Sequence, residues 1–144
     1  MDTSQLTKFR VAIYGVLVEN GRVLLTDTRV PSGIITNFPG GGLELGESPI
    51  SALEREFLEE TSVHVKVGNL LYCSRLFQQN PEYPHEQLMH IYYRVTRVGD
   101  QANLEGNGDD IAQASWVARG DLGNQRILAV DLEFVESSAF ISLF

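Results

Sequence analysis

The sequence predicts an α/β fold with a mixed β-sheet, in a single domain spanning residues 1–144. Strand-like runs stand before and after one clearly marked helix, and this order of elements is typical of α/β proteins. The 144 residues have the length of one ordinary domain, and the 43% apolar content is that of a globular chain. Element order, length and composition therefore all indicate one globular α/β unit.

The N-terminal part predicts a β-hairpin followed by a glycine-rich loop. Residues 9–18 and residues 22–28 are rich in Val, Ile, Leu and Thr and predict two strands. Asn20 and Gly21 separate them, and both residue types tolerate the positive φ of a tight turn. Residues 29–42 are irregular and end in three consecutive glycines, which a helix or strand interior would hold only at a cost. We therefore expect a loop with special backbone geometry before the helix.

The helix is predicted to begin at about Ser48 and to end near residues 61–62. Ser48 suits the N-cap, and Pro49 suits the first helical position, where a missing N–H is no loss. Leu53 and Phe57 follow at helical spacing and form the stripe that should be buried.

The C-terminal half predicts four more strands and a weak helix. The strands are expected at residues 63–67, 70–77, 87–98 and 111–117, and the weak helix at residues 131–140. Polar, turn-rich stretches join these elements, as loops do in a compact domain.

Charge and cysteine content exclude several classes of partner. Nineteen acidic against eleven basic residues give a formal net charge of −8, which disfavours a nucleic-acid partner. A small phosphorylated ligand is still compatible, because a bound divalent cation reverses the local field. The one cysteine, Cys73, allows no intrachain disulfide and is expected to be a buried, inert thiol. With neither a signal-peptide core nor a membrane-spanning stretch, we expect a cytoplasmic protein without a membrane partner.

Three glutamates predict a metal site on the helix. Glu56, Glu59 and Glu60 stand at positions i, i+3 and i+4, so they project from one face within about one turn. Their repulsion costs roughly 0.2–0.5 kcal/mol per pair, and a hard cation such as Mg²⁺ would cancel it. A solvated acidic face is the alternative, since Glu is a good helix former. The preceding glycines and Glu47 favour the metal site.

The residues of this region follow a known pattern. They run as Gly41, five residues, Glu47, seven residues, Arg55-Glu56-Phe57, one residue, Glu59-Glu60, one residue, and Ser62-Val63. This resembles the Nudix box, whose every specified position is matched except the last glycine, replaced by Ser62. That glycine closes the helix in a left-handed conformation, which costs a residue with a Cβ roughly 1 kcal/mol. Phe38-Pro39-Gly40 and Trp116-Val117 also resemble the family, so the resemblance extends over residues 9–121.

The resemblance implies a Nudix (MutT-like) α/β/α sandwich and a pyrophosphohydrolase activity. Such an enzyme would use Mg²⁺, with Mn²⁺ as a substitute, to cleave a diphosphate bond in a nucleoside diphosphate linked to another moiety. Four classes of small-molecule, nucleotide-like substrate remain open: nucleoside triphosphates, ADP-ribose, nucleotide sugars and dinucleoside polyphosphates. The resemblance is also compatible with a homodimer.

The resemblance also implies roles for individual residues. The metal would be held by Glu56, Glu59, Glu60 and the carbonyl oxygen of Gly41. Arg55 would be structural, because its planar fork suits a pair with Glu47 that holds the loop against the helix.

The general base has several candidates. Glu56 is one, and in this family the base can also come from a loop acid far along the chain. Asp110, six residues before Trp116, is preferred there over its neighbour Asp109, while Glu82 and Glu86 are further candidates. The alternative for the Asn-Gly-Asp-Asp stretch is a turn with no chemical role.

For the substrate, Arg29 could lie near the phosphates. Three aromatic residues could stack on a base or sugar: Phe77, Tyr83 and Tyr14. The alternatives are a surface cation and core aromatics.

Two other function classes compete with the hydrolase. One is a non-catalytic nucleotide-binding or regulatory module with a Nudix fold, and the other is a structural domain whose acids hold Ca²⁺. The complete set Glu56, Glu59 and Glu60 argues against the first. The helical placement of these acids, without the spacing of a Ca²⁺-binding loop, argues against the second.

Overall fold

The computed structural model describes residues 3–144, so the first two residues of the predicted domain lie outside it. The elements are β1 (Lys8–Val16), β2 (Val18–Glu19), β3 (Arg22–Val30), β4 (Gly33–Asn37), β5 (Gly40–Gly42), α1 (Pro49–Thr61), β6 (Val65–Cys73), β7 (Glu86–Arg97), β8 (Ile111–Ala118), a 3₁₀ helix (Arg119–Asn124), α2 (Ala129–Val135) and α3 (Ser138–Ile141). Within the described residues, no helix has the length and apolar character needed to span a membrane.

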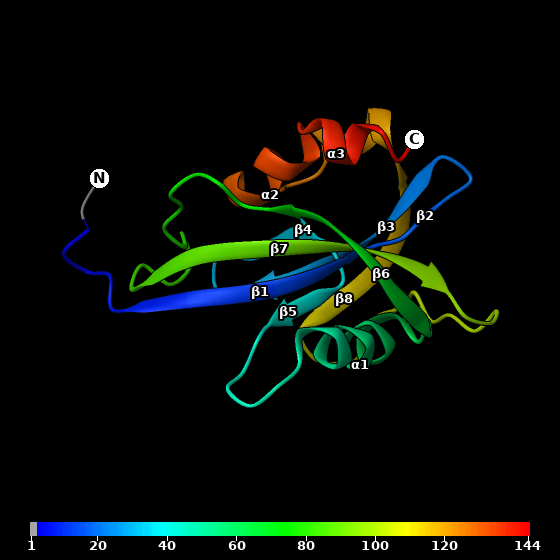
Figure 1. The fold of residues 1–144 in the computed structure, drawn as a ribbon, viewed down its shortest axis with the longest axis horizontal. Helices are drawn as coiled ribbons and strands as arrows, with labels where there is room; N and C mark the ends of the chain where they lie inside the picture. Colours follow the sequence, from blue (N-terminus) through cyan, green and yellow to red (C-terminus); the bar gives the residue numbers. More distant parts are fainter. Residues whose placement is uncertain (1–2) are drawn as a thin grey trace.

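Two sheets form the middle layer of the molecule (Figure 1). One has the strand order β5-β1-β7-β6 and is mixed, because β1 and β7 run parallel while the outer pairs are antiparallel. The other sheet places β3 between β4 and β8, and the short strand β2 pairs with the beginning of β3. All strand pairs in this second sheet are antiparallel. Helix α1 covers one side of the strands, and α2 and α3 cover the other. The predicted α/β/α architecture with a mixed sheet is confirmed.

Strand β1 lies in the centre and is buried on both faces, because its successive side chains point to opposite sides. Tyr14 packs into the cluster that contains Phe134 of α2, and Ile13 packs into the cluster that contains Phe57 of α1. At Gly15 a Cβ would lie 2.8 Å from the Phe57 ring. The glycine therefore lets α1 approach β1 closely enough to bring its acidic face to the strand ends.

The predicted helix agrees with α1 to within one residue at each end. Ser48 is the N-cap, as expected, with extended backbone, although its side chain makes no capping hydrogen bond. At the other end Ser62 adopts the left-handed conformation, with φ of 57°, and its N–H donates to the carbonyl of Leu58 at 2.8 Å. Ser62 thus holds the geometry that the family glycine would provide.

Replacing Ser62 by Gly should therefore stabilise the protein. We expect the free energy of unfolding to rise by up to about 1 kcal/mol, because glycine adopts positive φ without steric cost. Urea denaturation measures the change, with Ser51→Gly inside α1 as the matched control that should destabilise by a similar amount. An unchanged or lower stability of Ser62→Gly would show that the serine is not strained.

Residues 29–42 correct the sequence prediction. The expected irregular loop contains β4 and the three-glycine strand β5, whose Gly41 pairs with Ile13 of β1. A run of glycines carries no side-chain pattern, so the strand is defined only by its pairing with β1. Gly40 has φ of 139°, and a Cβ there would lie 2.1 Å from the Ile13 carbonyl oxygen. The special backbone geometry that was expected is thus present at Gly40.

Strand β6 corrects two further expectations. Residues 63–67 and 70–77 were predicted as separate strands, whereas Val65–Cys73 is one irregular strand with register shifts beside β7. It lies at the edge of its sheet, and Cys73 at its end is exposed rather than buried.

Candidate active site

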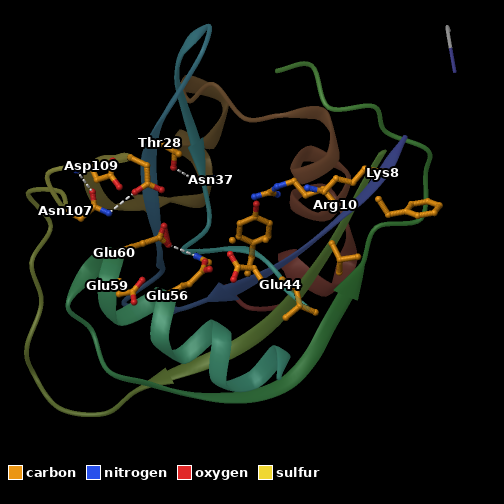
Figure 2. Close-up of a pocket in the computed structure, with 18 residues that line it drawn as sticks. Lys8, Arg10, Thr28, Asn37, Glu44, Glu56, Glu59, Glu60, Asn107 and Asp109 are labelled. Carbon is orange, nitrogen blue, oxygen red and sulfur yellow. Dashed lines mark hydrogen bonds between the residues drawn. The ribbon is translucent and has the colours of Figure 1, made fainter. Parts of the chain in front are cut away.

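A cavity of about 570 Å³ lies between α1, β1, β5 and the loop before β8 (Figure 2). Its lining contains six carboxylates and two cations: Glu44, Glu56, Glu59, Glu60, Asp109, Asp110, Lys8 and Arg10. In Figure 2 the glutamates of α1 lie on one side of the opening and the Asn107–Asp109 loop on another. The fold thus brings together acids that are about 50 residues apart in the sequence.

Two of the helix carboxylates are partly buried, and this changes their proton affinity. Burial raises the pKa of Glu60 to about 9, opposed by a hydrogen bond from the Gly40 N–H, which donates to Oε1 at 2.7 Å. Burial likewise raises the pKa of Glu56 to about 7, with the charge of Arg55 opposing it. The neighbouring acids add to both shifts. These are groups that a cation in the cavity would favour in the ionised form.

Gly41 of β5 leaves the space that the Glu56 carboxylate occupies. A Cβ on Gly41 would lie 2.3 Å from Oε2 of Glu56, so no other residue fits without moving that carboxylate. The structure thus brings the Gly41 backbone against the acidic face of α1.

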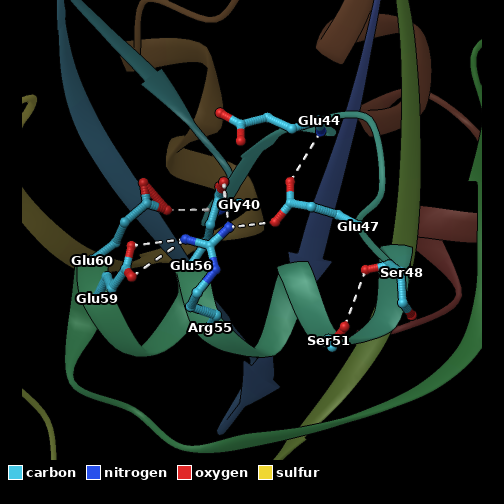
Figure 3. A network of polar contacts seen from close by, with 9 residues as sticks. All are labelled: Gly40, Glu44, Glu47, Ser48, Ser51, Arg55, Glu56, Glu59 and Glu60. Carbon is cyan, nitrogen blue, oxygen red and sulfur yellow. Dashed lines mark hydrogen bonds and ion pairs between the residues drawn. The ribbon is translucent and has the colours of Figure 1, made fainter.

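Arg55 joins the loop before α1 to the helix (Figure 3). Its Nη2 lies 2.7 Å from Oε2 of Glu47, and its Nη1 lies 3.2 Å from Oε2 of Glu59. The other oxygen of Glu47 accepts a hydrogen bond from the backbone N–H of Glu44 at 2.9 Å. Hydrogen bonds from Glu44 and Arg55 lower the pKa of Glu47, and the expected Arg55–Glu47 pair is present.

The donor set suits a hard divalent cation, although its members are not yet gathered around one point. Within residues 3–144 no three acidic, histidine or cysteine side chains are arranged as ready ligands. Glu59 is turned toward Arg55, and Glu60 is held by Gly40, which accounts for that spacing. The oxygen chemistry fits Mg²⁺, and Glu59, with an exposed side chain (58%), is free to change rotamer.

The loop before β8 brings both candidate aspartates to the cavity. Asn107 donates from Nδ2 to Oδ1 of Asp110 at 2.9 Å, and the Arg29 side chain donates to the carbonyl of Asp109 at 2.7 Å. The charge of Asp110 is one cause of the raised pKa of Glu60, which places these two carboxyls within electrostatic reach. Arg29 therefore anchors this loop and does not line the cavity.

Of the four residues expected to bind substrate, two line a cavity in the described part of the chain. Tyr83 lines a second cavity of about 390 Å³ that adjoins the first, whereas Phe77 and Arg29 line neither. Arg10 and Tyr14 line both cavities; Tyr14 was expected as a stacking surface, whereas Arg10 was not expected at the site. Arg10 could have been found from the sequence, because it stands two residues before the buried Ala12 on the same face of β1.

The raised pKa of Glu60 predicts how the stabilisation of the protein by Mg²⁺ depends on pH. In the unfolded chain Glu60 titrates near 4.5, whereas in the fold its pKa is about 9, so the folded protein binds the extra proton between these values. Stability of the metal-free protein therefore falls as pH rises across this window. Because metal needs the ionised acids, we expect Mg²⁺ to raise Tm more at about pH 8.5 than at about pH 6. Thermal melts at both values test this, and an equal or reversed shift would contradict it.

Comparison with known proteins agrees with this geometry. The human diphosphoinositol polyphosphate phosphohydrolase NUDT4B is 36% identical over 73 residues, which are 51% of this chain and 38% of that protein. The chain thus matches about two fifths of the length of that curated relative. A family model described as the NUDIX domain matches residues 7–137, which is most of the chain.

Solved structures share the fold over nearly the whole chain. The MutT NUDIX hydrolase from Burkholderia pseudomallei superposes with a TM-score of 0.76 at 22% identity, covering 92% of this chain and 99% of that one. The MutT protein from Methanosarcina mazei Go1 gives 0.74 at 21% identity, covering 90% and 92%. With the acidic helix, the glycine strand beside it and the match over residues 7–137, the chain belongs to the NUDIX (MutT-like) hydrolase family.

Proposed function

We propose that this protein is a Mg²⁺-dependent hydrolase that cleaves the diphosphate bond of a nucleoside diphosphate linked to another moiety. The observation that carries the proposal is the cavity that the α1 carboxylates and the Asp109–Asp110 loop line together, with the Gly41 backbone against Glu56. A divalent ion bound there, Mg²⁺ or Mn²⁺ in its place, would neutralise phosphate charge and lower the pKa of a bound water.

The chain's own residues divide the remaining work. Glu56, Glu59 and Glu60, with the carbonyl of Gly41, hold the metal, and Arg55 keeps the loop of Glu47 packed on the helix. Asp110 takes the proton from the attacking water, because it lines the cavity opposite α1 and need not serve as a ligand. Lys8 and Arg10 supply the positive charge that receives the phosphates.

Charge favours a nucleotide over a diphosphoinositol polyphosphate, the substrate class in the name of the human relative. A ring carrying six or more phosphates needs many cations around it, whereas two cations and six carboxylates line this cavity. The second cavity adds Glu82, Glu86 and Asp131 and no further Lys or Arg among the described residues. A substrate with a short phosphate chain and a neutral end group suits these charges better.

The test is product analysis across a panel of substrates with and without Mg²⁺. The panel contains nucleoside triphosphates, ADP-ribose, nucleotide sugars and one diphosphoinositol polyphosphate. We expect metal-dependent cleavage of a nucleotide and little turnover of the inositol compound. No turnover of any compound by folded, metal-binding protein would favour the non-catalytic nucleotide-binding module. Preferred cleavage of the inositol compound would overturn the substrate class. The single-domain organisation and the cytoplasmic location remain predictions.

A further inference from the structure

The second cavity differs in chemistry from the first. It lies beyond Arg10 and Tyr14, has a volume of about 390 Å³, and is within the size range of ligand pockets, roughly 300–1,000 Å³. Apolar side chains form much of its wall: Val30, Ile35, Leu88 and Leu128. A cavity so built suits a flat, uncharged group.

One buried polar atom in this region has no partner within the protein. His90 lines the cavity, and its side chain is 3% exposed. Nδ1 of the ring lies 2.8 Å from Oδ1 of Asp131, while Nε2 is buried without a hydrogen-bond partner among the described residues. Buried polar atoms are rarely left unpaired, so this acceptor needs a donor, from a bound water or from a ligand in the adjacent cavity.

The hydrogen-bond network assigns the proton of the His90 ring. Tyr92 donates its hydroxyl to the same Oδ1 of Asp131, and burial together with the Asp131 charge raises the pKa of Tyr92, so that hydroxyl keeps its proton. A carboxylate oxygen only accepts, so Nδ1 of His90 donates to it as well. In the neutral ring Nε2 then carries a lone pair and is an acceptor.

A second acceptor lies in the same cavity. Glu86 is 7% exposed, and its Oε1 accepts a hydrogen bond from Nδ2 of Asn80 at 2.9 Å. Among the described residues that line this cavity, Arg10 is the one Lys or Arg. It also lines the carboxylate cavity, so it lies where the two cavities meet, and it donates a hydrogen bond to the Tyr14 hydroxyl. The cavity therefore offers acceptors inside and a cation at its entrance.

We propose that the second cavity is the base-recognition pocket of this hydrolase and that His90 selects a nucleobase with an exocyclic amino group. The amino N–H donates to Nε2 of His90, the apolar wall covers the ring, and the phosphate chain passes Arg10 to the α1 carboxylates. His90 is thus a specificity-determining residue, held in its tautomer by Asp131. This inference rests on the proposed function only in taking the substrate to be a nucleotide.

Binding of nucleoside monophosphates tests the inference without any hydrolysis, because these compounds have no diphosphate bond. Calorimetry with Mg²⁺ present compares GMP with IMP, and AMP with purine riboside 5′-monophosphate. The members of each pair differ at the base by one exocyclic amino group. In at least one pair we expect the amino-bearing compound to bind about tenfold tighter or more, the effect of one satisfied buried acceptor. Equal affinity in both pairs, or no binding of any of the four, overturns the proposal.

Two variants locate the discrimination. His90→Phe keeps an aromatic ring and removes the acceptor, so the preferred pair should bind equally. Because that change also leaves Asp131 without its histidine partner, Val30→Trp provides a second route. It fills the cavity from its half-buried rim and should abolish binding of the monophosphates, while Val98→Trp, at an exposed position outside both cavities, should not. Unchanged binding by folded Val30→Trp contradicts the proposal.

The outcomes separate this inference from the function it builds on. Cleavage of the panel by an enzyme that does not discriminate within either pair leaves the hydrolase and overturns the role of His90. Discrimination within a pair, lost in Val30→Trp, by a protein that cleaves no panel compound leaves the pocket and overturns the hydrolase.

Discussion

Glu60→Gln is expected to reduce turnover of the best substrate by at least about a hundredfold, because it removes one negative charge from the metal site. The fold should be retained. Glutamine resembles the protonated acid that burial already favours at this position, and its carbonyl oxygen can still accept from the Gly40 N–H. Steady-state kinetics at saturating Mg²⁺, with a thermal melt of the same sample, measures both effects.

Glu54→Gln is the matched control for this change. Glu54 lies on the same helix and loses the same charge, but it does not line the cavity, so its turnover should be near that of the parent protein. If folded Glu60→Gln kept normal turnover, or if Glu54→Gln lost as much, the assignment of Glu60 to the metal would be wrong.

Gly41→Ala should impair catalysis while sparing the fold, with a loss of turnover of about tenfold to a hundredfold. The added Cβ would lie 2.3 Å from Oε2 of Glu56, the end of a flexible side chain that can move away at small energetic cost. The displaced carboxylate then no longer meets the metal in the required position. Comparison of kcat with Tm separates this effect from unfolding.

The neighbouring glycines show how specific this effect should be. Gly42→Ala places its Cβ 3.5 Å from Arg10, an ordinary contact, and should lose much less activity. Gly40→Ala meets the Ile13 backbone at 2.1 Å and should fail through loss of stability. Normal turnover in Gly41→Ala would show that the close approach to Glu56 has no catalytic role.

The sequence predicts those local features of the fold that depend on the conformational preferences of neighbouring residues. Pro49 and the apolar stripe with Phe57 place α1, and Asn20 with Gly21 places the hairpin turn, where φ is 52° and 71°. Each of these depends on the intrinsic preferences of a few adjacent residues. The spacing of the acids on α1 then follows from helix geometry.

Features that depend on distant partners were not predictable in the same way. The glycine strand β5 exists through its pairing with β1, and Cys73 is exposed because β6 is an edge strand, which no local pattern reveals. His90 joins Asp131 across 41 positions of sequence, so neither residue signals a site by itself. Arg29 was expected near the phosphates from its sequence position, but its side chain instead donates to the backbone carbonyl of Asp109 and holds that loop.

Binding of Mn²⁺ to the α1 carboxylates, followed by electron paramagnetic resonance, tests the central claim most directly. The account predicts that the parent protein and Glu54→Gln bind Mn²⁺ with the same affinity and that Mg²⁺ displaces it. Glu60→Gln should bind at least about tenfold more weakly, because it lacks one ligand charge. No Mn²⁺ binding by the folded parent protein, or equal affinity in Glu60→Gln, would contradict a metal-dependent hydrolase built on this helix.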